Sequence, residues 1–234
     1  MATIGGYNVV TDGLVLSLDA ANHKSYVSGS GTWFDVSGNN NSGSLTNGPT
    51  FTTEKNGGIV FDGVNDVVLT PTLNQQFLTT GLTLSVIIKY NQTTANDNVI
   101  CWGSNGAFNS LTSNAWEFRL RGLNYIEFAV GRTIGAEVTP RRLQYVVNLN
   151  NRIVAIDITY IANGIATMYE NGIPVATQDY TGAGTSTTTR SVEIGKGTDT
   201  YFPGTMYAVK LYNRALSAQE ILQNYNAQKG RFGL

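Results

Sequence analysis

Charge, histidine and cysteine are all scarce in this chain of 234 residues. Only 13% of the residues are charged, the formal net charge is -1, and the chain has one histidine, His23, and one cysteine, Cys101. A single cysteine excludes an intrachain disulfide and a thiolate metal cluster, and a single histidine excludes a multi-histidine metal site. The nearest approach to a basic cluster, Arg141-Arg142, is too small for the phosphate binding that nucleic-acid recognition requires.

Long apolar runs are missing as well. No stretch approaches the roughly 20 residues that a membrane-spanning helix needs. The N-terminal segment "MATIGGYNVVTDGLVLSLDA" is broken by Asp12 and Gly13 and has no basic start, so it does not resemble a signal peptide. We therefore expect a chain that is made and folded in a cytoplasm, without membrane insertion. Its hydrophobic content of 41%, with no linker or charge block, predicts one domain with a sizeable core.

Alternation of apolar and polar residues recurs along the whole chain, which is typical of half-buried strands. Three segments show it clearly: "GLVLSLDA" from Gly13, "LTLSVIIKY" from Leu82 and "AWEFRLRG" from Ala115. We expect the apolar members to share one face of each strand, as Leu84 and Val86 do in the second segment. Such strands, joined by turns rich in Gly and Asn without intervening helices, predict two packed antiparallel sheets.

Two Asn-Gly pairs mark the strongest local prediction. Asn163-Gly164 and Asn171-Gly172 each separate two alternating runs. Asn-Gly tolerates the positive φ angles of a type I′ turn, so the segment predicts a three-stranded meander with two tight hairpins. Pro174 cannot donate a ladder hydrogen bond, which predicts an edge position or a bend for the last of these strands.

One segment near the C-terminus, "LYNRALSAQEILQNYNAQKG", predicts a helix. Ser217 and Glu220 have the spacing of a capping box, and Gly230 suits the helix end. Residues at helical spacing form a narrow apolar stripe: Ala218, Ile221, Leu222 and Tyr225. An isolated helix of this length is marginal in water, so we expect it to pack against an edge or face of the sandwich.

The order of several segments resembles the laminin-G-like branch of the concanavalin A-like lectin/glucanase superfamily. These segments are "GLVLSLDAANHKSY", "WFDVSGNNNSGSLTNGPTF", "GGIVFDGVNDVV", "ATMYENGIPV", "VEIGKG" and "YFPGTMYAVKLYNRALSAQEILQNYNA". The resemblance runs from about Leu14 to Gly230. It implies an all-β jelly-roll sandwich of two antiparallel sheets with one short C-terminal helix, and a function in glycan or protein binding, often assisted by calcium, or less often in glycoside hydrolysis.

The amino-acid sequences of both ends, "YNVVTDGLVLSLDAANHKSY" and "NYNAQKGRFGL", are similar to those of single-domain laminin-G-like proteins that tailed phages encode as virion components. Our first interpretation is therefore a non-enzymatic virion structural protein of a capsid, neck, tail or fibre. Its partners would be other virion proteins, copies of itself and cell-surface glycans. The alternative is a free carbohydrate-binding lectin that uses calcium.

A glycoside hydrolase is the least favoured class. The glucanases of the superfamily carry E-x-D-x-x-E on one strand, which places a nucleophile and an acid/base on the same face. This chain has no such run, because Glu117, Glu127 and Asp157 each stand alone on their strands. We expect no catalytic residues.

Aromatic faces are the usual means of holding a sugar, with polar groups fixing its orientation. The candidates for glycan binding are Trp33, Tyr201 and Phe202. Trp116 alternates with Phe118 and is expected in the core, whereas Trp102 could face either way.

Calcium requires several oxygen ligands, and four side chains in two loops could supply them. These candidates are Asp35, Asp62, Asn65 and Asp66. The same residue types are common in turns, and we favour that interpretation. The resemblance points the same way, because Tyr207-Ala208 stands where many relatives have Asp-Glu.

The termini are expected to lie outside the sandwich. We predict an N-terminal arm over 1–10, the jelly-roll domain over 11–230 and a C-terminal tail over 231–234. Two interpretations stay open: each end folds back on its own domain or frays, as termini usually do, or a neighbouring subunit or virion protein holds these apolar segments.

Overall fold

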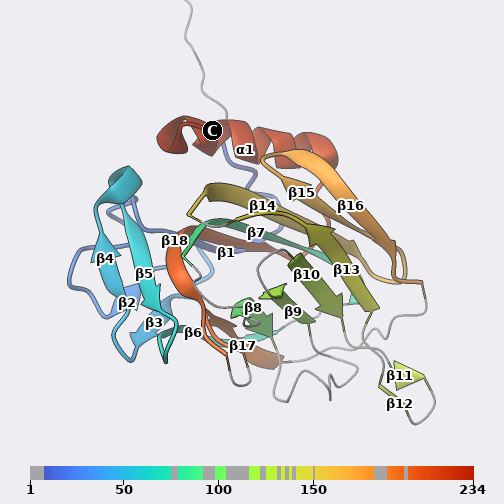
Figure 1. The fold of residues 1–234 in the computed structure, drawn as a ribbon, viewed down its shortest axis with the longest axis horizontal. Helices are drawn as coiled ribbons and strands as arrows, with labels where there is room; N and C mark the ends of the chain where they lie inside the picture. The colour runs from blue at the N-terminus through green and yellow to red at the C-terminus, as the bar shows by residue number, and fades with distance from the viewer. Residues whose placement is uncertain are drawn as a thin grey trace, which may run out of the picture.

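The structure is a computed structural model that describes residues 8–74, 79–91, 98–103, 116–121, 125–130, 133–134, 137–138, 141–149, 151–181, 189–197 and 200–234. Strands dominate these residues and form two packed antiparallel sheets, with one helix across the outside of the sandwich (Figure 1). The predicted all-β sandwich with one C-terminal helix is confirmed.

Sheet A contains eight strands in the order β16-β15-β14-β7-β18-β5-β4, and β1 also pairs with β18. The bounds of its strands are β1 Leu14–Asp19, β4 Thr50–Thr52, β5 Gly58–Asp62, β7 Gly81–Tyr90, β14 Ile153–Ile161, β15 Ile165–Glu170, β16 Ile173–Asp179 and β18 Pro203–Tyr212. A short 3-10 helix, η1 (Glu54–Asn56), joins β4 to β5.

Sheet B contains eight strands in the order β13-β10-β9-β8-β17-β6-β3-β2. Their bounds are β2 Thr32–Trp33, β3 Gly43–Thr46, β6 Val67–Asn74, β8 Asn98–Gly103, β9 Trp116–Arg121, β10 Tyr125–Val130, β13 Arg141–Val146 and β17 Thr189–Ile194. A separate small hairpin pairs β11 (Thr133–Ile134) with β12 (Glu137–Val138).

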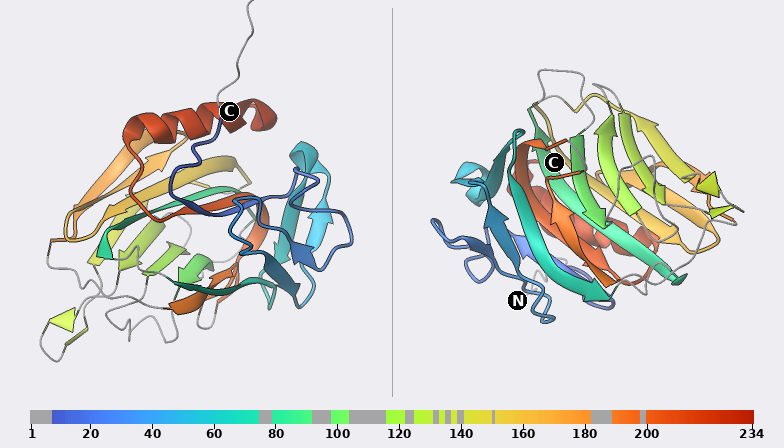
Figure 2. Two further views of the ribbon diagram at one scale, coloured as in Figure 1. Left: turned by 180° about the vertical axis from the view of Figure 1, so that it is seen from behind. Right: turned by 90° about the horizontal axis from the view of Figure 1, so that it is seen from below.

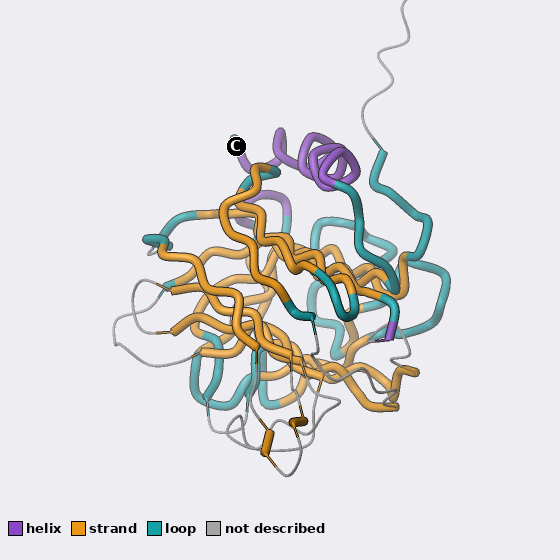
Figure 3. The backbone as a smooth tube through the Cα atoms, turned by 90° about the vertical axis from the view of Figure 1, so that its right-hand side faces the viewer, coloured by secondary structure: helices purple, strands orange, loops and turns teal. Residues whose placement is uncertain are grey.

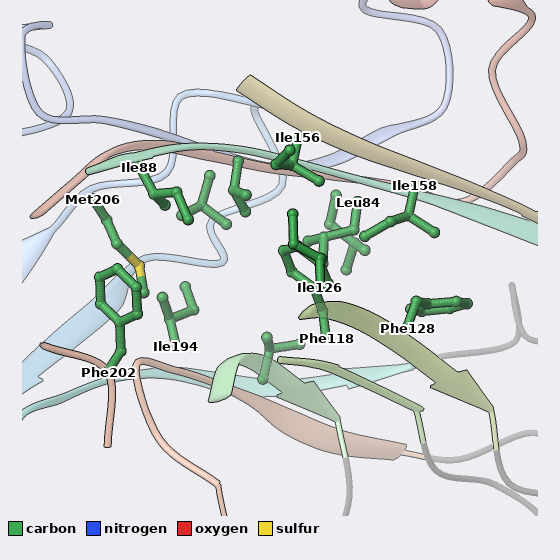
Figure 4. Packing of buried hydrophobic residues seen from close by; sticks show 14 of the residues in the cluster. Leu84, Ile88, Phe118, Ile126, Phe128, Ile156, Ile158, Ile194, Phe202 and Met206 are labelled. Atoms are coloured by element: carbon green, nitrogen blue, oxygen red, sulfur yellow. The ribbon is translucent and has the colours of Figure 1, made fainter. Parts of the chain in front are cut away.

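The core lies between the two sheets, where side chains from both inner faces meet. Figure 4 shows Ile88 and Ile156 of sheet A pointing toward Phe118 and Ile194 of sheet B. This cluster includes the predicted inward faces of β1, β7 and β9, where Leu18, Leu84 and Phe118 are almost fully buried. The period-two prediction is therefore confirmed for the inner faces.

The outer faces differ from the half-buried pattern that the sequence suggests. In β7, Thr83 and Ser85 are buried although they point away from the core, because the chain after β18 and helix α1 cover this side of sheet A. The Thr83 hydroxyl donates to the Arg214 carbonyl oxygen at 2.8 Å and accepts from the Leu216 N–H at 2.8 Å. Figure 2 (left) shows the molecule from behind, with the helix again on the outside of sheet A.

The three-stranded meander β14-β15-β16 is confirmed. At the second hairpin, Asn171 and Gly172 have φ values of 52° and 79°, as a type I′ turn requires. At the first hairpin, Asn163 has a positive φ but Gly164 does not, so the type I′ prediction is wrong there. Pro174 lies in β16, the edge strand of sheet A, where the register shifts next to it. Both features agree with the missing donor of proline.

Helix α1 (Ala218–Phe232) begins with the predicted capping box between Ser217 and Glu220. It continues through Gly230, so the predicted end is wrong; it ends at Gly233, which has a left-handed conformation. Figure 3 shows the helix on one side of the strand layers.

The buried face of the helix is also different from the predicted stripe. Its buried residues are Ile221, Asn224 and Phe232. Leu222 is 45% exposed and Ala218 is exposed, because the helix is rotated so that its polar Asn224 faces the sheet.

The first two residues of the predicted C-terminal tail, Arg231 and Phe232, belong to this helix, and Gly233 caps it. Phe232 is 4% exposed and packs edge-on against Tyr207, with ring centroids 5.2 Å apart. At the other terminus, the Val10 N–H donates to Asn224 Oδ1 at 2.8 Å, and the Tyr212 hydroxyl donates to the Val10 carbonyl oxygen at 3.1 Å. The first seven residues of the predicted arm lie outside the described residues.

Among the described residues, no helix has the length and apolar character needed to span a membrane.

Candidate functional site

A groove of about 400 Å³ opens where the edge strands of the two sheets meet. Two segments form its walls: residues 26–31, which lead into β2 of sheet B, and residues 45–51, which run from β3 into β4 of sheet A. Its lining residues are Tyr26, Ser28, Gly29, Ser30, Gly31, Leu45, Gly48, Pro49, Thr50 and Phe51. The volume lies in the range of small-ligand sites, which is about 300–1,000 Å³. β2 to β5 are at the left of Figure 1.

Hydrogen bonds within the first wall and between the two walls hold both segments in place. The Tyr26 hydroxyl donates to the Ser30 carbonyl oxygen at 3.1 Å, and the Leu45 N–H donates to the Gly31 carbonyl oxygen at 2.8 Å. In the second wall, Asn47 and Gly48 have φ values of 68° and 112°, which few other residue types adopt without strain. The groove is therefore built into the fold.

A pair of aromatic rings supports the groove. Tyr26 and Phe51 stack with centroids 5.2 Å apart and an interplanar angle of 26°. Tyr26 is only 4% exposed, and burial raises the pKa of its hydroxyl, which outweighs the lowering by a backbone hydrogen bond at Gly29. Tyr26 therefore backs Phe51, which is half-buried and presents the accessible aromatic surface.

The remaining lining groups are hydroxyls and peptide groups. Ser28 and Thr50 are exposed, so their hydroxyl groups can reach a ligand, and the glycines leave backbone polar groups accessible. One aromatic surface beside several neutral hydrogen-bonding groups suits a small molecule that has both an apolar face and hydroxyl groups. Sequence reasoning missed this combination, although Tyr26 begins the Gly- and Ser-rich stretch "YVSGSG" and Phe51 ends the stretch "NGPTF".

Two of the three aromatic residues predicted to bind glycan are in the core. Trp33 and Phe202 are both 0% exposed, and Phe202 stacks on Tyr90 with centroids 5.8 Å apart. Neither offers a ring face to a ligand, so these two predictions are wrong. Tyr201 is partly exposed and forms an isolated bridge with Lys196, away from the groove lining; its role stays a prediction.

The other two tryptophans do not line the groove. Trp116 is 0% exposed, as expected for a core residue. Trp102 lies in β8, and its side chain is outside the described part of the structure.

Asp35, the first predicted metal ligand, is engaged by protein donors on both carboxylate oxygens. Oδ1 accepts from the N–H groups of Ser17 and Ser37, each at 2.9 Å. Oδ2 accepts from the Ser37 hydroxyl at 2.8 Å and the Asn41 N–H at 2.9 Å. This pattern is that of a carboxylate that organises a loop.

Asp62, Asn65 and Asp66 occupy one turn, as predicted. Asp62 Oδ1 accepts from the Val64 N–H at 2.8 Å, and Asp66 Oδ2 accepts from the Asp62 N–H at 2.9 Å. Asp66 is 3% exposed, and its Oδ1 has no hydrogen-bond partner among the described residues. No group of three or more Asp, Glu, His or Cys residues within the described ranges is arranged to hold a metal ion.

A second polar cluster lies on the outer face of sheet B. Glu127 of β10 is 0% exposed and faces Arg119 of β9 and Gln144 of β13 across the strands. Its carboxylate accepts from Arg119 Nη2 at 2.7 Å, from Arg142 Nη1 at 2.6 Å and from Gln144 Nε2 at 2.6 Å.

Burial alone would raise the pKa of Glu127, but the two arginines and the Gln144 amide lower the pKa overall. A carboxyl group that is held ionised in this way cannot act as a general acid, which needs a raised pKa. Glu117 lies on the same face of β9, with Oε1 4.0 Å from Arg119 Nη1. Glu127, Arg119, Arg142 and Glu117 therefore belong to one ion network.

A third polar group lies under helix α1. Asp157, Ser85 and Lys210 are cross-strand neighbours on β14, β7 and β18, and Lys210 Nζ donates to Gln228 Oε1 of the helix at 2.8 Å. A cavity of about 10 Å³ beside Asp157 is far too small for a sugar. This group therefore supports the helix. Within the part of the chain that the structure describes, the groove is the candidate binding site that we consider further.

Comparison with protein families matches residues 62–222, well over half of the chain, to the family described as the concanavalin A-like lectin/glucanases superfamily. Comparison with curated proteins found no significant match.

Among solved structures, the chain is similar to botulinum neurotoxin binding domains. It is 14% identical to the serotype DC domain in complex with rat synaptotagmin II, with a TM-score of 0.74, covering 94% of this chain and 52% of that one. It is 15% identical to the serotype D domain in complex with N-acetylneuraminic acid, with a TM-score of 0.71 and the same coverage. This chain thus spans about half the length of those domains, and at such identity the likeness shows the fold.

Proposed function

This chain belongs to the concanavalin A-like lectin/glucanases superfamily, and from that membership we propose that it binds glycan in the groove between residues 26–31 and 45–51. The observation that carries the proposal is the groove itself, with Phe51 stacked on Tyr26 beside the exposed hydroxyls of Ser28 and Thr50. The groove lies N-terminal to the matched residues 62–222, so its assignment depends on geometry rather than on the family match.

A glycan array probed with the purified chain tests this proposal. We expect saturable binding to at least one glycan. Ser28→Trp places a large ring at an exposed position of the groove and should weaken binding at least tenfold without disturbing the core. Leu222→Ala is the control, because Leu222 is exposed on the helix and does not line the groove. Binding that is unchanged in Ser28→Trp would show that the glycan binds elsewhere.

We propose that the chain is not an enzyme. Glu127, the fully buried carboxylate of sheet B, accepts hydrogen bonds from three neighbouring side chains and is held ionised. The described residues that line the groove include no carboxylate side chain. Incubation with a bound glycan should release no new reducing ends, and hydrolysis that is abolished by replacing one carboxylate would contradict this.

We also propose that the carboxylates of Asp35 and Asp62 hold turns rather than calcium, since protein N–H and hydroxyl groups occupy the oxygens described above. Adding calcium or a chelator should leave the unfolding temperature and glycan binding unchanged. A saturable, calcium-dependent rise in the unfolding temperature that is lost in Asp66→Asn would contradict the proposal and favour a calcium-assisted lectin.

For the biological setting, we propose a structural component of a tailed-phage virion that presents this domain on a capsid, neck, tail or fibre. The similarity of the sequence segments at both ends to phage virion proteins supports this proposal. Mass spectrometry of purified particles should detect the chain. Its detection only in the soluble fraction of infected cells would favour a free lectin.

The N-terminal arm is the segment that we propose for assembly. Deleting Met1 to Val9 should weaken docking to other virion proteins or to copies of the chain, while the fold stays intact because the bonds of Val10 to Asn224 and Tyr212 remain. A truncated chain that assembles normally would contradict this proposal.

A further inference from the structure

None of the described residues that line the groove carries a charged side chain. These ten residues are aromatic, aliphatic, hydroxyl-bearing, proline or glycine. The cation nearest to Tyr26 along the chain is Lys24, which is exposed and does not line the groove. Among the residues that the structure describes, a ligand in the groove therefore meets neutral hydrogen-bonding groups and an aromatic surface.

A buried carboxyl group lies behind the second wall. A methyl group built on the α-carbon of Gly48 would come within 3.9 Å of Asp66 Oδ1. Asp66 is 3% exposed, and this oxygen has no hydrogen-bond partner in the part of the chain that the structure describes. Burial raises the pKa of Asp66 most; the backbone hydrogen bond from Asp62 lowers it, and the charge of Asp62 raises it again, so that the pKa is raised overall. The group that lies behind Gly48 is thus a carboxyl group.

Anionic sugars need the opposite environment. Carboxylate and sulfate groups are usually bound by arginine or lysine through charge-assisted hydrogen bonds. Removing such a group from water without a partner is strongly unfavourable. A neutral sugar has no such requirement, because its C–H face can lie on Phe51 while its hydroxyl groups bond to Ser28, Thr50 and the backbone.

We infer that the groove selects uncharged glycans, ending in hexoses or N-acetylhexosamines, over the same glycans ending in sialic acid or carrying sulfate. This inference rests on the proposed glycan-binding function. It goes beyond that function by naming the chemical class of the ligand and the cause of selection, which is an uncharged lining backed by the carboxyl group of Asp66.

Pairs of glycans that differ only in a terminal sialic acid test the inference by calorimetry with the purified chain. We expect the affinity for each neutral member to exceed that for its sialylated partner at least tenfold. Ser28→Lys adds a cation at an exposed position of the lining and should reduce this ratio at least threefold. Ser28→Gln is the matched control, because it has a similar reach without the charge.

Phe51→Ala locates the binding. It should weaken neutral-glycan binding at least tenfold, because aromatic anchors dominate such contacts. Ser28→Trp serves the same purpose if the alanine variant does not fold.

The outcomes separate the inference from the function. If no glycan of either kind binds, the proposed function and the inference both fail. If sialylated glycans bind as well as neutral ones, and Ser28→Trp abolishes both, the function holds and the inference is overturned. If neutral glycans bind equally to the parent chain and to Ser28→Trp, the ligand lies outside the groove, and the inference fails.

Discussion

Replacing Asp157 with asparagine should stabilise this protein at neutral pH. Asp157 is 3% exposed, lies between sheet A and helix α1, and has an Oδ1 without a hydrogen-bond partner among the described residues. Burial raises the pKa of Asp157 from its usual 3.8 to about 6, although hydrogen bonding with Ser85 and the charge of Lys210 lower it. The folded protein therefore holds this proton more tightly than the unfolded chain does.

The sign and size of the effect follow from that difference. A raised folded-state pKa contributes stability that is fully present below about pH 4 and is lost as the pH rises through about 6. At 1.36 kcal/mol for each pKa unit, ionised Asp157 lowers the free energy of unfolding by about 3 kcal/mol at neutral pH. Asparagine resembles the protonated carboxyl group, so Asp157→Asn should recover up to about 3 kcal/mol there. Lys210 keeps Gln228 Oε1 as its acceptor, at 2.8 Å.

Urea unfolding of both proteins at pH 4, 5.5 and 7.5 measures this. We expect similar midpoints at pH 4 and a growing advantage of Asp157→Asn toward pH 7.5. Asp179→Asn is the control with the opposite sign, because hydrogen bonds from Thr181 lower the pKa of this exposed carboxyl group. A variant that is less stable at pH 7.5, or equally more stable at all three pH values, would refute the reasoning.

Three further substitutions and one control test the rest of the fold by urea unfolding. Glu127→Gln should destabilise by about 3–5 kcal/mol, because it removes the buried negative charge that Arg119 and Arg142 share, whereas Glu193→Gln in a partly exposed pair should cost less than about 1 kcal/mol; equal effects would contradict the ion-network interpretation. Ser217→Ala removes half of the capping box and should cost about 1 kcal/mol, and no change would show that the cap is unimportant. Phe232→Ala removes the ring that packs on Tyr207 and should cost about 3 kcal/mol and speed proteolysis of the helix; a helix that resists proteolysis as before would count against this anchor.

Local signals explain what could be predicted from the sequence. Alternation in β1, β7 and β9 depends only on neighbouring residues, and it correctly identified Leu18, Leu84 and Phe118 as core. The capping box and the Asn171-Gly172 turn are equally local, since each involves residues at most three positions apart. Such signals survive in the fold because packing and backbone preference agree there.

Burial on the outer faces could not be predicted, because it depends on segments distant in sequence. Ser85, Asp157 and Lys210 look like solvent-facing residues of amphipathic strands, yet all three are buried. They form one row across β14, β7 and β18, and that row exists only once the register is set. The predicted apolar stripe of the helix differs from its buried face for the same reason. The polar Asn224 faces inward, where it forms hydrogen bonds with Val10 and Tyr212.

The groove was missed because it joins residues that only the sandwich edge brings together. Tyr26 precedes β2 of sheet B and Phe51 lies in β4 of sheet A, and neither residue is unusual in its own segment. Trp33 was one of the predicted candidates, but it lies in β2 and is fully buried in the core. Exposure, rather than residue type, separates these aromatic residues, and exposure is a property of the whole fold.

The C-terminal helix also supports the part of the fold that carries the groove. The guanidinium group of Arg231 donates to the carbonyl oxygens of Lys55 and Gly57 and pairs with Asp19 at 2.6 Å. Lys55 belongs to η1, which joins β4, the strand of Phe51, to β5. Gly57 lies so close to the backbone of Ala20 that an added Cβ would come within 2.4 Å of its carbonyl oxygen. The helix therefore ties the β4–β5 connection to β1, and one wall of the groove depends on an element more than 160 residues further along the chain.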